Sequence, residues 1–126
     1  MRGQRIAVLI SGTGSNLQAL IDGVARGEIN GEIAVVISNR ENALGLQKAK
    51  TAGIPTRVLS FSNFKARGHS REVYDSALAA MVREYTPDLV VLAGWMRILS
   101  LAFIDCFQDK LINLHPALPG QFPGKD

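Results

Sequence analysis

Apolar residues along the chain alternate between short continuous runs and longer sets with helical spacing. The continuous runs are shorter than an ordinary helix, and nearly unbroken apolarity of this length is typical of strands covered on both faces. These runs occupy residues 5–10, 33–37, 56–59, 89–93 and 111–115. The pattern therefore predicts a β-sheet of buried strands.

Helical patterns lie between these runs. Leu17, Leu20, Ile21 and Val24 recur three or four positions apart, which is the spacing of one helix face, and Gly27 is placed to end that helix. Further short helices are predicted for residues 43–52, closed by Gly53, and for residues 100–107, with Ser100 as the N-cap.

The strongest helical pattern covers residues 70–85. Ser70 is placed as its N-cap, and residues 86–88 break it. Its predicted apolar stripe consists of Val73, Ala77, Leu78, Met81 and Val82. The preceding residues, 60–69, are predicted to form a long polar connection.

Strands that alternate with helices predict an α/β fold, namely a Rossmann-like open parallel sheet flanked by helices. Ligands bind at the carboxyl ends of the strands in such sheets. Three segments follow strands and carry unusual sequences: residues 11–16, 94–99 and 113–124. We expect the functional site to form where they meet.

Composition narrows the class of protein. The chain has 126 residues, of which 47% are hydrophobic and 20% are charged, and this balance predicts a single folded domain. Cys106 is its one cysteine, which indicates a reducing compartment. The longest apolar run, residues 89–96, is far shorter than a membrane span. We therefore expect a cytoplasmic protein with no membrane partner.

The charge distribution points to a small anionic partner. The net charge of +3 is too low to argue for nucleic acid, which is disfavoured as a partner. No acidic residue lies between Glu41 and Glu72. The basic residues of that region are Lys48, Lys50, Arg57, Lys65, Arg67 and Arg71. They fit an anionic small molecule, although ordinary solvated lysines and arginines would give the same pattern.

The first candidate for chemistry is Ser-Gly-Thr-Gly-Ser-Asn at residues 11–16, between a strand and a helix. Glycines allow close backbone approach, and the free amides at a helix start favour an anion. The pattern lacks the third glycine of a dinucleotide fingerprint, because Leu17 stands in its place. The preferred interpretation is a loop that binds a phosphate monoester. The alternative is a simple strand–helix turn with no ligand.

The second candidate is Asn113 with His115, which share a strand face because they are two residues apart. An amide donor can stabilise an oxyanion and an imidazole can move protons, so the pair suits acyl transfer. Ile112 and Leu114 are predicted to point into packing. A structural hydrogen-bonding role is the alternative. Only two histidines are present and Cys106 lies in no ligand pattern, so no metal site is predicted.

The third candidate is Gly-Trp-Met-Arg-Ile-Leu at residues 94–99, which follows an apolar strand. This segment could line an apolar pocket for a flat aromatic ligand, with its amides reading the polar edge. The alternative is a hydrophobic loop that packs on the next helix, because it would have the same sequence pattern.

Five motifs in one order along the chain resemble the phosphoribosylglycinamide formyltransferase family, also called glycinamide ribonucleotide transformylases. They are Ile-Ser-Gly-Thr-Gly-Ser-Asn-Leu-Gln-Ala-Leu (10–20), Ser-Asn-Arg (38–40), Ser-Arg-Glu-Val-Tyr-Asp (70–75), Pro-Asp-Leu-Val-Val-Leu-Ala-Gly-Trp-Met-Arg-Ile-Leu-Ser (87–100) and Asn-Leu-His-Pro-Ala-Leu-Pro (113–119). Each motif is weak alone, whereas the ordered set is specific.

This resemblance implies transfer of the formyl group of 10-formyltetrahydrofolate to the amine of glycinamide ribonucleotide, in purine biosynthesis. It implies that Gly14, Ser15 and Asn16 hold the ribonucleotide phosphate. The folate-site positions of the family are matched by Arg71, Met96, Arg97, Ile98, Leu99 and Asn113. Asn113 matches the residue that polarises the formyl oxygen, and His115 matches the catalytic proton-transfer residue. A homodimer is the assembly compatible with this interpretation.

The resemblance also indicates an N-terminal part, residues 1–126, that is incomplete relative to the family. The family continues further and carries a catalytic Asp there, which no residue here matches. The sequence differs locally too, because Pro119 comes one place earlier than the family pattern has it.

Three alternatives stay open at this point. Methionyl-tRNA formyltransferase and formyltetrahydrofolate hydrolase share the Asn-x-His arrangement on a similar fold. An inactive or partial nucleotide-binding fragment is the third. The glycine-rich loop and the Trp-Met-Arg-Ile-Leu segment favour the ribonucleotide enzyme.

Overall fold

A computed structural model describes residues 3–114 and contains one parallel sheet. Its strands are β1 (Gln4–Ile10), β2 (Gly31–Ser38), β3 (Thr56–Val58), β4 (Leu89–Ala93) and β5 (Leu111–Leu114). They are ordered β3-β2-β1-β4-β5, and every neighbouring pair is parallel. The predicted open parallel sheet is therefore confirmed. His115, predicted as the last residue of the fifth strand, lies outside the described residues.

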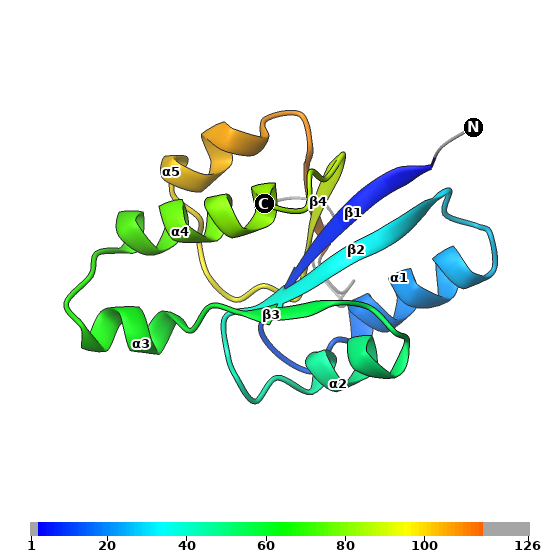
Figure 1. The fold of residues 1–126 in the computed structure, drawn as a ribbon, viewed down its shortest axis with the longest axis horizontal. Coiled ribbons are helices and arrows are strands. Elements are labelled where there is room, and N and C mark those ends of the chain that lie inside the picture. Colours follow the sequence, from blue (N-terminus) through cyan, green and yellow to red (C-terminus); the bar gives the residue numbers. More distant parts are fainter. Residues whose placement is uncertain (1–2, 115–126) are drawn as a thin grey trace, which may run out of the picture.

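Helices cover both faces of the sheet. They are α1 (Ser15–Ala25), α2 (Leu44–Thr51), α3 (Phe61–Ala66), α4 (Arg71–Arg83) and α5 (Leu101–Ile104), followed by a 3₁₀ turn η1 (Asp105–Phe107). Figure 1 shows α1 and α2 on one side of the sheet, and α3, α4 and α5 on the other. This three-layer arrangement explains why the strands read as continuous apolar runs, since both of their faces are buried.

Strand β1 divides the core into two clusters because its side chains alternate between the two faces. Val8 and Ile10 pack with Leu17 of α1 on one face. Leu9 packs with Leu78 of α4 on the other. All of these residues are fully buried, so burial of apolar area holds β1 at the centre of the fold.

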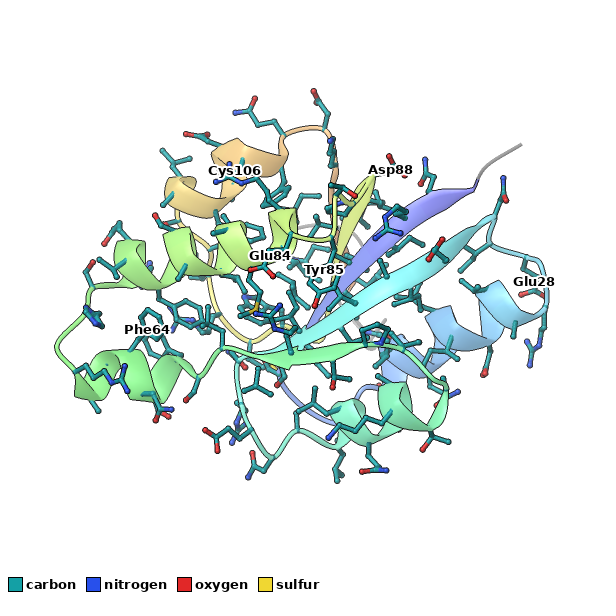
Figure 2. All side chains as sticks on the ribbon, viewed as in Figure 1. Glu28, Phe64, Glu84, Tyr85, Asp88 and Cys106 are labelled. Carbon is teal, nitrogen blue, oxygen red and sulfur yellow. The ribbon has the colours of Figure 1, made fainter. Side chains whose placement is uncertain are left out.

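The segment predicted as a long polar connection, residues 60–69, contains helix α3. Ser60 caps this helix, its side-chain oxygen accepting a hydrogen bond from the amide of Asn63. Phe61 and Phe64 meet Tyr74 edge-on, with ring centroids 5.5 and 5.2 Å apart, and Figure 2 shows Phe64 between α3 and α4. A six-residue helix is unstable alone. Tertiary contacts with α4 therefore stabilise α3, and the sequence pattern did not reveal them.

The contacts between α3 and α4 make the buried face of α4 differ from the predicted apolar stripe. Leu78 and Val82 are buried as predicted, but Val73 is 46% exposed and the prediction for it is wrong. Tyr74 is buried instead, because its ring completes the contact with α3. Asp75 is also buried on this face.

Two predicted helix caps have different outcomes. Ser70 caps α4 as predicted, its side-chain oxygen accepting from the amide of Val73 at 3.2 Å. Ser100 occupies the N-cap position of α5, but its side chain makes no capping hydrogen bond. Its backbone amide donates to Asp75 instead.

Strand β5 is the edge of the described sheet. Leu114 is half-buried beside the core cluster on the α1 side. Ile112 is 43% exposed, so the prediction that it points into packing is wrong.

Among residues 3–114, no helix is long and apolar enough to cross a membrane.

Candidate functional site

The strand order places a topological switch point between β1 and β4. From β1 the sheet runs through β2 to β3 on one side, and through β4 to β5 on the other. Connections leaving β1 and β4 at this point diverge to opposite faces, and the crevice between them is where open α/β sheets bind ligands. The glycine loop (residues 11–14) follows β1, and the β4–α5 loop (residues 94–99) follows β4.

The glycine loop turns into α1 at Gly14. This residue has φ +80°, a left-handed conformation that favours glycine. It is the N-cap of α1 and has no side chain to accept hydrogen bonds from the first-turn amides. The start of the helix is therefore open to an anion, as the loop sequence predicted.

Gly45 of α2 packs directly against this loop. A Cβ atom built on Gly14 would lie 2.7 Å from the Cα atom of Gly45. The amide of Gly45 also donates a 3.0 Å hydrogen bond to the carbonyl of Gly12. Two glycines are thus needed for α2 to approach the loop, and the sequence analysis did not identify Gly45.

A cavity of about 280 Å³ lies at the switch point, between the glycine loop and the end of β4. Its lining comprises Gly12, Thr13, Gly14, Ser15, Asn16, Ala93, Gly94, Trp95, Met96 and Leu114. The structure brings together the three residues predicted to hold a phosphate, Gly14, Ser15 and Asn16, on one side of this cavity.

A second, more apolar cavity of about 620 Å³ lies beside it. Its lining comprises Leu92, Trp95, Met96, Arg97, Ile98, Leu99, Ile104, Leu111 and Asn113. All four residues predicted to form the folate loop, Met96 to Leu99, line this cavity, and Asn113 joins them from β5. Its volume suits a small organic ligand.

The two cavities meet at Trp95 and Met96, which line both of them. Ser11 connects the loops behind this point. Its side-chain oxygen accepts a hydrogen bond from the Met96 amide at 2.9 Å, and Ser11 is only 1% exposed. A ligand in one cavity would therefore lie next to a ligand in the other.

Asn113 projects toward the α4 and α5 side of the sheet. It shares the apolar cavity with Leu111, two residues before it on the same strand face. Leu114, the next residue, lines the smaller cavity instead. His115, predicted to act with Asn113, lies outside the described residues.

Arg97 has its guanidinium against aromatic rings. Its central carbon lies 3.3 Å from the ring centroid of Phe61 and 5.3 Å from that of Tyr74. Burial lowers the pKa of Arg97, while the charge of Asp75 opposes this shift. The charge of Arg71 also lowers that pKa. Arg71 does not line the apolar cavity.

The basic region found in the sequence is not uniform. Arg57 forms a 2.9 Å ion pair with Glu84 and also donates to the hydroxyl of Tyr85. These bonds raise the pKa of Arg57 and occupy its guanidinium. Lys65 and Arg67 are exposed at the end of α3.

Within the described part of the chain, no three His, Cys, Asp or Glu side chains gather as metal ligands would. Side chains that sequence reasoning missed are Ser11 and Asp75, which hold the β4–α5 loop from other elements. The sequence signal that could have revealed Asp75 is an acidic residue on the helix face that also carries Leu78 and Val82, since carboxylates are rarely buried without a partner.

Taken together, these features define an α/β protein of the Rossmann-like class, with two adjoining cavities at the switch point of its sheet. A family model described as formyl transferase matches residues 4–126, and the chain belongs to this family.

Similar proteins support this assignment. The chain is 50% identical over 128 residues to a phosphoribosylglycinamide formyltransferase of Dictyostelium discoideum, covering 94% of this chain and 62% of that protein. It is 49% identical over 119 residues to the Escherichia coli (strain K12) protein of the same name, covering 94% of this chain and 54% of that one. The chain thus spans little more than half the length of these relatives.

A solved structure with a similar fold supports the same family assignment. The crystal structure of glycinamide ribonucleotide transformylase 1 from Symbiobacterium toebii superposes with a TM-score of 0.85 at 43% identity. The match covers 97% of this chain and 56% of that one.

Proposed function

We propose that residues 1–126 form the N-terminal unit of a cytoplasmic phosphoribosylglycinamide formyltransferase. This enzyme would transfer the formyl group of 10-formyltetrahydrofolate to the amine of glycinamide ribonucleotide. The observation that carries the proposal is the pair of cavities that meet at Trp95 and Met96. One suits a phosphate-bearing acceptor and the other suits a flat, largely apolar donor, so their reacting groups can meet at the shared wall.

The smaller cavity is the proposed acceptor site. The ribonucleotide phosphate would accept hydrogen bonds from the first-turn amides of α1 and from Ser15 and Asn16. The uncapped start of α1 at Gly14 supports this assignment, because a free helix N-terminus favours negative charge.

The apolar cavity is the proposed donor site. The pterin would lie among Met96, Ile98 and Leu99, whose loop amides can read its polar edge. Arg97 lines this cavity, and we assign Arg71 with it to the carboxylates of the folate tail, because both carry positive charge. Lys65 and Arg67 would add to this field, whereas Arg57 is occupied by Glu84.

The proposed reaction is an acyl transfer. The acceptor amine attacks the formyl carbon, and the carbonyl oxygen becomes an oxyanion. Asn113 would donate a hydrogen bond from its side-chain amide to that oxyanion. His115 would carry the proton from the attacking amine to the departing N10 of the folate, which leaves as tetrahydrofolate.

The test compares three acceptors in the full-length protein. With 10-formyltetrahydrofolate as donor, formylated product is measured after addition of glycinamide ribonucleotide or methionyl initiator tRNA, and formate release is measured in water alone. We expect product only with the ribonucleotide. Formylation of the tRNA instead would identify a methionyl-tRNA formyltransferase, and donor hydrolysis would identify a hydrolase. Either result would overturn the proposal.

A binding titration separates activity from ligand recognition. Trp95 is the one tryptophan of the chain and lines both cavities, so its fluorescence reports on each. We expect saturable changes with the donor and with the ribonucleotide. A nucleotide-binding fragment without donor binding would respond to the ribonucleotide alone.

A further inference from the structure

Asp75 is an unusual residue of helix α4. It is 0% exposed, and it is the one buried acidic side chain among residues 3–114. A carboxylate is almost never fully buried without a compensating partner, because its desolvation is costly. Asp75 lines neither of the two cavities.

The partner of Asp75 lies at the end of the β4–α5 loop. Its Oδ2 atom accepts a hydrogen bond from the backbone amide of Ser100 at 2.7 Å. Ser100 directly follows Leu99, the last of the loop residues that line the apolar cavity. A charged acceptor makes this a strong hydrogen bond, and it spans two separate elements.

The same carboxylate acts on Arg97 within the loop. Its charge favours the charged guanidinium there, against the cost of burial. The guanidinium carbon of Arg97 lies 3.3 Å from the ring centroid of Phe61. The direct contact of Asp75 with the loop is therefore its hydrogen bond to the Ser100 amide.

Few side chains from other elements bind the backbone of the β4–α5 loop. Among the described residues, two side chains from elsewhere bind the backbone of residues 94–100: Ser11 at the Met96 amide and Asp75 at the Ser100 amide. Buried polar atoms of Trp95, Arg97 and Ser100 have no hydrogen-bond partner within that part of the chain. Trp95 and Leu99 also pack in the core, so the two hydrogen bonds from Ser11 and Asp75 add to that packing in fixing the loop.

We propose that Asp75 is a positioning residue of the formyl-donor site, which holds residues 96–99 in their binding conformation through the Ser100 amide. The inference rests on the proposed function, since it assigns the apolar cavity to the folate. Loss of the carboxylate releases one end of the loop, so donor binding weakens. The glycine loop is held by β1, α1 and Gly45, so acceptor binding is retained.

Three variants of the full-length protein test this role. Asp75→Ala removes both the hydrogen bond and the charge. Asp75→Asn keeps an acceptor oxygen of similar shape and removes only the charge. Ser100→Ala is the matched control, because it keeps the backbone donor and removes a hydroxyl that has no partner within the described chain. Trp95 fluorescence gives the Kd of 10-formyltetrahydrofolate and of glycinamide ribonucleotide for each.

We expect Asp75→Ala to weaken donor binding by about tenfold or more, in line with loss of a buried hydrogen bond to a charged group. Ribonucleotide affinity should stay within about twofold, and Ser100→Ala should bind both ligands as the parent does. Asp75→Asn should lie between the parent and Asp75→Ala. Backbone amide exchange at Ser100 should accelerate in Asp75→Ala and stay slow in Ser100→Ala.

Two results would overturn the inference. One is unchanged donor affinity in both Asp75 variants. The other is an equal loss of both ligands, or of folding, in Asp75→Asn as well as Asp75→Ala, which would make Asp75 a residue of general stability. If the parent protein itself fails to bind the donor, the proposed function fails, and that result is distinct from either outcome for Asp75.

Discussion

The backbone amide of Met96 donates a 2.9 Å hydrogen bond to the side-chain oxygen of Ser11, 85 positions earlier in the chain. Ser11 follows β1 and Met96 follows β4, so this bond joins the two loops of the switch point. Met96 lines both cavities. The relative position of the two sites thus depends in part on one buried hydroxyl.

Ser11→Ala removes this acceptor and leaves the Met96 amide without its partner. We expect a loss of about 1–3 kcal/mol in the free energy of unfolding, measured by urea denaturation. Thr13→Ala is the matched control, because Thr13 is an exposed residue of the same loop. Equal stability of the two variants would contradict a structural role for the Ser11 hydroxyl.

Gly14→Ala should be costly for two reasons. The new Cβ would sit in a left-handed conformation and would come within 2.7 Å of the Gly45 Cα atom. We expect a loss of about 2–4 kcal/mol in unfolding free energy, together with weaker ribonucleotide binding.

Gly12→Ala is the control for this substitution. A Cβ built on Gly12 meets nothing within 4 Å, so this variant should lose far less stability. Similar losses at the two positions would show that the close approach of α2 does not restrict the loop.

Asn113→Ala should lower turnover by about 10²–10³-fold, since it removes a donor to the developing oxyanion. Ribonucleotide affinity should change little, because Asn113 lines only the apolar cavity. Steady-state kinetics and the Trp95 titration measure the two effects separately. Ile112→Ala, on the opposite face of the same strand, should leave turnover near the parent value. A parallel loss of binding and turnover in Asn113→Ala would instead indicate a structural role.

Charge reversal at Lys65 and Arg67 should weaken folate binding by a few-fold at low salt. Both lie at the end of α3, and the effect should fade at high salt because it acts through exposed charges. Lys50→Glu, on the exposed surface of α2, is the comparison. Donor affinity that stays the same at low salt in the Lys65 and Arg67 variant would remove these residues from the donor site.

Tyr74 predicts a dependence of stability on alkaline pH. Burial raises its pKa above the ordinary value of about 10. Above that pH the unfolded chain releases the proton while the folded protein keeps it, so the free energy of unfolding falls as pH rises. Urea unfolding between about pH 9 and 11 measures this slope.

Tyr74→Phe removes the titrating hydroxyl, so its slope should be shallower than that of the parent. Its stability near neutral pH should be lower, because the hydroxyl donates a 2.6 Å hydrogen bond to the Leu59 carbonyl. Tyr85→Phe, which leaves Tyr74 in place, is the control. Identical slopes in the parent and Tyr74→Phe would contradict the prediction.

Local pattern was sufficient for the strands and for most helices. Continuous apolar runs identified β1, β2 and β4 because a strand covered on both faces buries every side chain. Helix α3 was missed, since six residues with only Phe61 and Phe64 apolar carry too weak a period to distinguish a helix from a loop. Contact with Tyr74 decided its structure.

The candidate site divides in the same way. Short spacings along the chain were sufficient to predict the parallel sheet and the segments that follow its strands. The assignment of a phosphate and an oxyanion to these segments stays a prediction. Tertiary structure alone decided that Met96 joins two cavities and that Gly45 supports the glycine loop. It alone also placed Ser11 and Asp75 as the anchors of the β4–α5 loop. These relationships connect residues on different elements, so they depend on how the layers pack and leave no periodic signal in the sequence.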